Sequence, residues 1–155
     1  MRCLYFSLSI VATFVCLRIV RAEAPAEFKI FDNAVRAMCI SPDGKSVAFA
    51  SDDGEIALWD LAAKKVTRNW KGDAHGVRAL QFSSGGALLY SGGKSGKIRL
   101  WETKNGELRK QTETIGVIED VCLSPDGKLV AVTFDEGDAV QIFDADLGKE
   151  LHRLK

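Results

Sequence analysis

Side chains that could catalyse a reaction or hold a metal are few in this chain and lie far apart. Histidine occurs only twice, as His75 and His152, and neither belongs to a paired-histidine, Cys-x-x-Cys or calcium-loop pattern. No serine or cysteine nucleophile has a plausible base partner. The sequence therefore predicts no metal site, no cofactor and no catalytic centre.

Two kinds of short motif resemble catalytic motifs but are better explained as turns. Residues 91–97 (SGGKSGK) are glycine-rich, yet a phosphate-binding loop is followed by a helix, and a strand-type pattern follows here. The acidic pairs at 52–53 and 135–136 have the composition for acid–base chemistry, but they recur at regular intervals between apolar runs. Both features are typical of hairpin turns.

A repeat positions all of these residues. Residues 77–105 comprise three short apolar-rich runs separated by turn residues, and the same order begins again at Val35 and, one residue looser, at Ile118. The dipeptides that begin at Trp59, Trp101 and Phe143 are each 42 residues apart. A period of this length predicts copies of one supersecondary unit packed against one another.

Each repeat predicts four strands joined by tight turns. In the first repeat the strands are expected at 35–40, 45–50, 55–59 and 65–70. The turn Ser41-Pro42-Asp43-Gly44 fits type I, because proline presets φ at the second position and glycine relieves the exit. The third repeat carries one extra residue within 135–138, which predicts a longer or bulged hairpin there.

Four strands per unit of 40–45 residues, with Trp-Asp closing the third strand, resembles the WD-repeat β-propeller family. The resemblance implies an all-β fold: a β-propeller segment of three four-stranded antiparallel blades, at about 32–72, 73–113 and 114–155. The sequence departs from the family at the usual Gly-His pair. Gly72-Asp73 holds that place in the second repeat, and Phe31 and Thr114 hold the histidine place in the others. The family's His–Ser/Thr–Asp–Trp hydrogen-bond network is therefore expected to lack its histidine.

Alternating apolar residues predict the core between blades, with Trp59, Trp101 and Phe143 anchoring each third strand. The residues expected to fill the space between blades are Met38, Ile40, Val47, Phe49, Ile56, Leu58, Leu80, Phe82, Leu88, Ile98, Leu100, Val121, Leu123, Val130 and Ile142. Closed propellers use 4–8 blades, so three would leave apolar faces open at both ends. Two explanations stay open: the chain is truncated from a longer one, or copies self-assemble, two of them giving six blades.

The N-terminal residues 1–22 are typical of an export signal. Arg2 precedes an uncharged run of 14 residues from Leu4 to Leu17, and small or moderate residues suit cleavage after Ala22. The prediction is an apolar signal helix, or alternatively a membrane anchor, on an exported protein that is periplasmic, secreted or membrane-anchored. Residues 23–31 are expected to form a linker and a short strand from Glu27.

Cysteine usage adds little. Cys39 and Cys122 occupy the same position of the first and third repeats, and the repeat arrangement places a blade between them. We therefore expect free, packed thiols rather than a disulfide.

The remaining candidate function is a binding surface. In WD-repeat propellers, residues that flank the first Val of the inner strand lie around the channel mouth and often contact partners. By resemblance these positions are Ala34 and Arg36, Gly76 and Arg78, and Val117 and Glu119. Arg36 and Arg78 would suit an acidic partner, unless both are simply solvated. His75 is expected in the same loop, either as a pH-sensitive contact or as an ordinary exposed histidine.

The sequence thus predicts a non-catalytic scaffold that binds a protein partner, possibly an acidic one, through loops at one end of the blades. A formal net charge of zero argues against nucleic-acid binding through bulk charge. The alternative is the propeller part of a larger enzyme or electron-transfer protein whose active site lies outside this chain.

Overall fold

The computed structural model describes residues 27–155, which form twelve strands in three four-stranded antiparallel sheets. The first sheet contains β1 (Val35–Ile40), β2 (Ser46–Ser51), β3 (Glu55–Asp60) and β4 (Lys65–Lys71). The second contains β5 (Val77–Phe82), β6 (Leu88–Gly93), β7 (Lys97–Glu102) and β8 (Leu108–Glu113). The third contains β9 (Ile118–Leu123), β10 (Leu129–Phe134), β11 (Val140–Asp144) and β12 (Glu150–Leu154).

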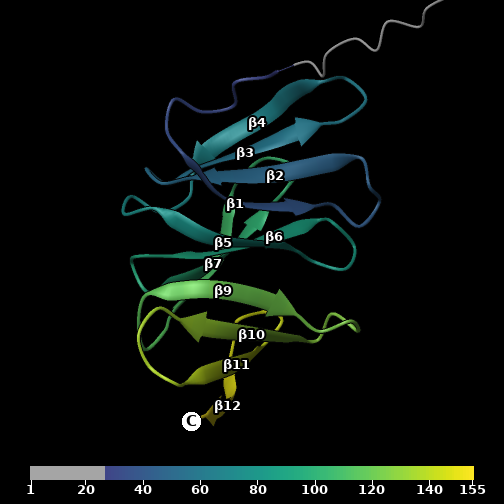
Figure 1. Cartoon of the computed structure of the whole chain (residues 1–155). Helices are drawn as coiled ribbons and strands as arrows, with labels where there is room; N and C mark the ends of the chain where they lie inside the picture. The colour runs from purple at the N-terminus through teal and green to yellow at the C-terminus, as the bar shows by residue number, and fades with distance from the viewer. Residues whose placement is uncertain (1–26) are drawn as a thin grey trace, which may run out of the picture.

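The sheets, hereafter blades 1, 2 and 3, follow one another through the molecule, from β1–β4 at one end to β9–β12 at the other (Figure 1). Strands within each blade are hydrogen-bonded in chain order, and the innermost strands β1, β5 and β9 lie side by side. This arrangement confirms the predicted all-β fold of three propeller-type blades. None of the described residues forms a helix of the length and apolar character needed to span a membrane.

Two predictions concern the N-terminal part. The predicted signal segment, 1–22, lies outside the described residues. The predicted short strand at 27–31 is not formed, because residues 27–34 pair with no strand. Instead, Phe28 packs on Trp59 with ring centroids 4.9 Å apart.

The turn chemistry expected from sequence is present. The amide of Gly44 donates to the Ser41 carbonyl at 2.8 Å, and the Ser41 hydroxyl donates to Asp43 at 2.6 Å. Gly44 has a φ of 68°, in the left-handed region that glycine tolerates. The corresponding turn before β10 repeats both bonds, and its Gly127 has a φ of 71°. These turns fix the register between the first two strands of each blade.

Each blade has two faces that differ in their neighbours. We call the face toward the preceding blade the leading face and the face toward the following blade the trailing face. The trailing face of blade 1 contributes buried or half-buried side chains to the first core, among them Cys39, Ala48, Ile56 and Leu58. The leading face of blade 2 meets them with Leu80, Phe82, Leu89 and Trp101. Fully burying such an apolar side chain contributes about 1.5–3 kcal/mol, so this interface holds the two sheets together.

The second core repeats this arrangement between blades 2 and 3. Its most buried members are Tyr90, Ile98, Leu100, Ile118, Val130, Val132, Phe143 and Leu147. Hydrogen bonds add direction: the Tyr90 hydroxyl donates to the Ala145 carbonyl at 2.6 Å, and the Thr112 hydroxyl donates to the Leu147 carbonyl at 2.8 Å. Blade 2 is therefore covered on both faces.

The outermost faces correct part of the predicted core. Met38 is 62% exposed and Ile40 is 59% exposed, because both lie on the leading face of blade 1, which no blade covers. Trp59 on the same face is only half-buried, whereas Trp101 and Phe143 are buried as predicted. Cys122 is a free thiol, but it is exposed on the trailing face of blade 3 rather than packed.

Candidate functional site

Six charged side chains from all three blades meet at one end of the inner strands. They line a hollow of about 340 Å³ and are Arg36, Asp52, Arg78, Lys94, Glu119 and Asp135. We call this the charged hollow. Three of its residues are the second residues of β1, β5 and β9, and three come from the hairpins that follow β2, β6 and β10. The repeat thus places one strand residue and one hairpin residue of each blade at the same opening.

Asp52 links blades 1 and 2 across this opening. Its Oδ1 lies 3.0 Å from Lys94 Nζ and 3.3 Å from Arg36 Nε. The hydrogen bond from Lys94, followed by that from Arg36, lowers the pKa of the Asp52 carboxyl below its ordinary value. The carboxylate therefore stays charged and holds two cations from neighbouring blades.

Arg78 links blades 2 and 3 in the same way. Its Nη1 lies 2.7 Å from Glu119 Oε2 and 2.7 Å from Asp135 Oδ2. The hydrogen bond from Arg78 to Asp135 is the main cause of a raised Arg78 pKa, and Glu119 adds to it. Partial burial lowers the Arg78 pKa and offsets part of this rise, and the side chain of Arg78 remains 28% exposed.

The structure brings three of the four predicted site residues together. Arg36, Arg78 and Glu119 all line the charged hollow. Neither arginine is free, because each is ion-paired to carboxylates, a state that the sequence analysis did not consider. His75 lies elsewhere, in an adjoining hollow lined in part by Asp73, Ser95 and Arg99.

Sequence reasoning missed the other half of the charged hollow. Asp52, Lys94 and Asp135 occupy the same hairpin position of the three repeats, and the first and last were interpreted only as turn residues. The recurring charge at that position was the available signal. Whether these charged residues meet depends on how far their side chains extend across the blade boundaries, and the repeat pattern alone does not give that distance.

A buried network surrounds Asp73, whose side chain is 2% exposed. Its carboxylate accepts hydrogen bonds from the Ser95 hydroxyl, from Arg99 Nη1 at 2.9 Å and from the His75 amide at 3.0 Å. Burial by itself raises the pKa of Asp73, but these hydrogen bonds and the Arg99 charge outweigh it and leave the pKa below its ordinary value. The His75 ring is 73% exposed, with Nδ1 3.6 Å from Asp73 Oδ1.

This network stands where the family's histidine network was expected to be incomplete. Asp73 holds the histidine place and is paired with a cation, Arg99, on β7. The Trp101 Nε1 donor of the same blade reaches the Ser91 hydroxyl at 2.8 Å. Blade 2 therefore has a substitute network built on the Asp73–Arg99 ion pair. Both side chains are shielded from solvent, which suits a structural role rather than ligand binding.

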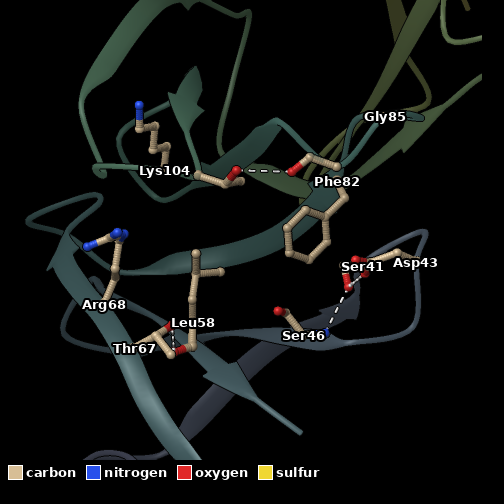
Figure 2. Close-up of a pocket in the computed structure, with 11 residues that line it drawn as sticks. Ser41, Asp43, Ser46, Leu58, Thr67, Arg68, Phe82, Gly85 and Lys104 are labelled. Carbon is tan, nitrogen blue, oxygen red and sulfur yellow. Dashed lines mark hydrogen bonds between the residues drawn. The ribbon is translucent and has the colours of Figure 1, made fainter. Parts of the chain in front are cut away.

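A second groove opens between blades 1 and 2 at the opposite end of the strands (Figure 2). The side chains of Leu58 and Phe82 point into it from the two blades, and Arg68 and Lys104 stand at its rim. Several of its hydroxyl groups have partners within the chain: Thr67 donates to the Leu58 carbonyl at 3.2 Å, and Ser41 donates to Asp43 at 2.6 Å. This groove is explained by turn and strand chemistry, and we do not assign it a ligand.

Comparison with known proteins identifies the fold. The family model described as "WD domain, G-beta repeat" matches residues 26–60 and 64–102. The protein groucho of Drosophila melanogaster is 31% identical over 99 residues, which cover 64% of this chain and 14% of that protein. The solved structures that this chain resembles include those of U3-55K and of the WD40 repeats of RRP9. Each has a TM-score of 0.76 and 16% sequence identity, and each match covers 81% of this chain and 40% of the other chain.

The hydrazine synthase of Kuenenia stuttgartiensis is similar in fold as well, with a TM-score of 0.73, 18% identity and coverage of 84% of this chain and 38% of that one. The chain thus spans well under half the length of each of these proteins. The three blades, the repeat period and these matches together define a WD-repeat β-propeller architecture. The matches support membership of the WD-repeat family, whose propellers are generally non-catalytic scaffolds for protein interactions.

Among residues 27–155, no group of three or more histidine, cysteine, aspartate and glutamate side chains is arranged to hold a metal ion.

Proposed function

We propose that this chain is a non-catalytic scaffold that binds a protein partner through the charged hollow. The observation that supports it is the convergence of six charged side chains from three blades on one opening, through ion pairs that cross both blade boundaries. The side chains that carry these pairs remain 28–55% exposed. Exposed ion pairs contribute little to stability, so these charges are better suited to recognition than to folding.

The expected partner carries charges of both signs. The hollow contains three cations and three carboxylates, and the arginines are held by acids of this chain. A purely acidic segment would have to displace those acids, whereas a segment with alternating charges can exchange one ion pair for another. Complementary charge of this kind sets specificity and register more than raw affinity.

Charge reversal tests the proposal. Affinity capture of binding proteins from extracts of the source organism is compared for the native chain, the double variant Arg36→Glu/Arg78→Glu and the control variant Arg68→Glu/Lys104→Glu. The control pair lies at the opposite end of the strands. We expect the same partner with the native and control chains and at least a tenfold weaker interaction with the first variant. Unchanged binding by that variant, with an unchanged melting temperature, would refute the charged hollow as the contact surface.

Export is part of the proposal and rests on the pattern of residues 1–22. If the segment is a signal, the mature protein begins at Glu23, and N-terminal sequencing of protein recovered from the exported fraction checks this. Recovery of the intact N-terminus from the cytoplasm would contradict export. The control is the variant Val20→Arg, whose large charged residue should block cleavage after Ala22.

A further inference from the structure

We propose that the trailing face of blade 3 and the leading face of blade 1 are complementary, so that two copies of the chain associate head to tail. Both faces are apolar and open. On blade 1, Met38 is 62% exposed and Ile40 is 59% exposed, and on blade 3 Leu129 is 40% exposed and Cys122 is also exposed. The inference rests mainly on the faces of the outer sheets, and it involves the charged hollow only through Arg36 and Glu119 at the inner rim.

The interface already present between blades 1 and 2 shows what such a contact would be. There, Cys39, Ala48, Ile56 and Leu58 meet Leu80, Phe82, Leu89 and Trp101. The trailing face of blade 3 repeats the first set at equivalent positions, with Cys122, Ala131, Val140 and Ile142. The leading face of blade 1 repeats the second set, with Met38, Ile40, Val47 and Trp59. A second copy is therefore the occupant that these faces fit, since their contact reproduces an interface that the chain already makes.

Charge at the inner rim supports the same pairing. In the boundary between blades 2 and 3, Arg78 and Glu119 occupy equivalent strand positions and lie 2.7 Å apart. At the proposed boundary the equivalent positions are Glu119 and Arg36 of the second copy, which again have opposite charge. Six blades is within the range that closes a propeller, so two copies suffice to remove both open faces.

Two features make this association weaker than the contact between blades 1 and 2. Asp120 and Thr133 stand at the places of Ala37 and Ala50 and introduce polar groups into the face. On the leading face of blade 1, Phe28 packs on Trp59 in the way that Trp70 packs on Trp101. Leu154 is the residue of blade 3 that is equivalent to Trp70 in the repeat, so Leu154 of a second copy takes this place on Trp59 in the proposed dimer. Residues 27–31 must therefore leave Trp59 when the second copy docks, so they compete with self-association.

Sedimentation velocity of the full chain over a hundredfold range of concentration tests the proposal. The expected result is a shift from the monomer to twice its mass, and Phe28→Ser should move the midpoint to a several-fold lower concentration. Met38→Lys and Thr133→Lys should each abolish the closed dimer. Ile115→Lys changes an apolar side chain that is 47% exposed in the loop between β8 and β9, off both faces, and should leave the dimer unchanged.

Mixing the two interface variants distinguishes head-to-tail contact from other geometries. Each variant retains one native face, so an equimolar mixture should regain a dimer through a single interface. A monomer at every concentration would overturn the proposal. It would also be overturned if Met38→Lys dissociates the dimer and Thr133→Lys does not, because two leading faces would then be paired. The charged-hollow variant Arg78→Glu changes neither outer face nor Arg36, so failure of one proposal is separable from failure of the other.

Discussion

Blade 2 and its two neighbours have nearly the same sequence pattern but different surroundings. Leu80 in blade 2 is 6% exposed, whereas Met38 at the equivalent position of blade 1 is 62% exposed. Trp101 is buried and bonded to Ser91, whereas Trp59 is half-buried beneath Phe28. The difference shows that the repeat determines which side chains face outward from a sheet, but only a neighbouring sheet makes them a core.

The comparison extends to charge. In blade 2 the Asp73–Arg99 ion pair is shielded, with side chains that are 2% and 13% exposed. The Arg36–Asp52 pair of blade 1 is open to solvent, with side chains that are 53% and 36% exposed. Water screens the second pair and not the first, so equivalent changes in the two should have very different effects.

The largest expected effect is loss of the shielded ion pair. Asp73→Ala leaves Arg99 without its partner in a buried site, and we expect a loss of about 3–5 kcal/mol in the free energy of unfolding. Asp52→Ala in the exposed pair should cause no measurable loss. Urea denaturation of the two variants checks this, and adding Arg99→Ala to Asp73→Ala should restore part of the stability. Equal stability of the two single variants would show that shielding is not what separates the pairs.

A matched pair of apolar truncations comes next. Leu80→Ala creates a cavity in the core between blades 1 and 2 and should cost about 2–5 kcal/mol. Met38→Ala removes a side chain that is already mostly in solvent, and its effect at low protein concentration should stay within about 0.5 kcal/mol. Urea midpoints at matched slopes give both values. A cost for Met38→Ala that approaches that of Leu80→Ala would mean that the leading face of blade 1 is covered in solution.

The shielded ion pair of blade 2 should also give a smaller, pH-dependent effect on the free energy of unfolding. The pKa of Asp73 lies below its ordinary value of 3.8, so the unfolded chain binds this proton more readily than the folded one. The stabilisation is fully present above the unfolded pKa and is lost as the pH falls through the folded one. The free energy of unfolding should therefore decline below about pH 4 more steeply for the native chain than for Asp73→Asn. Parallel curves for the two proteins would remove Asp73 from the acid response.

Much of the fold was predictable because the repeat encodes it locally. Turn residues such as Pro42 and Gly44 limit the backbone, and alternating apolar positions define the two faces of each strand. The pattern could not distinguish Met38 from Leu80, since both are apolar residues at the same repeat position and differ only in what lies opposite. Exposure of that kind is a property of the assembly of sheets rather than of any one strand.

The candidate site was predictable only in part, for a related reason. The family position of Arg36, Arg78 and Glu119 placed them at one opening, and the structure brings them there. Their partners depend on side-chain reach across blade boundaries, such as the 2.7 Å contact from Arg78 to Asp135, 57 residues later in the chain. The Asp73–Arg99 ion pair was not predicted for the same reason. Asp73 lies in a loop and Arg99 in β7, and no local sequence pattern joins them.

The smallest effect, and the sharpest test of the comparison, uses the two equivalent cysteines. Burial is the main cause of a Cys39 pKa raised to about 12, against which a hydrogen bond with the Phe82 backbone acts weakly, so almost none of this thiol is ionised at pH 8. Because the thiolate is the reactive form, a thiol reagent at pH 8 should modify the exposed Cys122 and spare Cys39.

Peptide mapping by mass spectrometry after brief alkylation measures both sites in one sample, and alkylation in denaturant, where the two should react equally, is the control. At dilutions where the chain is monomeric, Cys122 should react at least tenfold faster than Cys39. At concentrations where head-to-tail association occurs, Cys122 acquires the neighbour that Cys39 already has, and its reactivity should fall toward that of Cys39. If the reactivity of Cys122 does not depend on concentration, the trailing face of blade 3 remains open. Equivalent repeat positions would then have different surroundings even when a second copy is present.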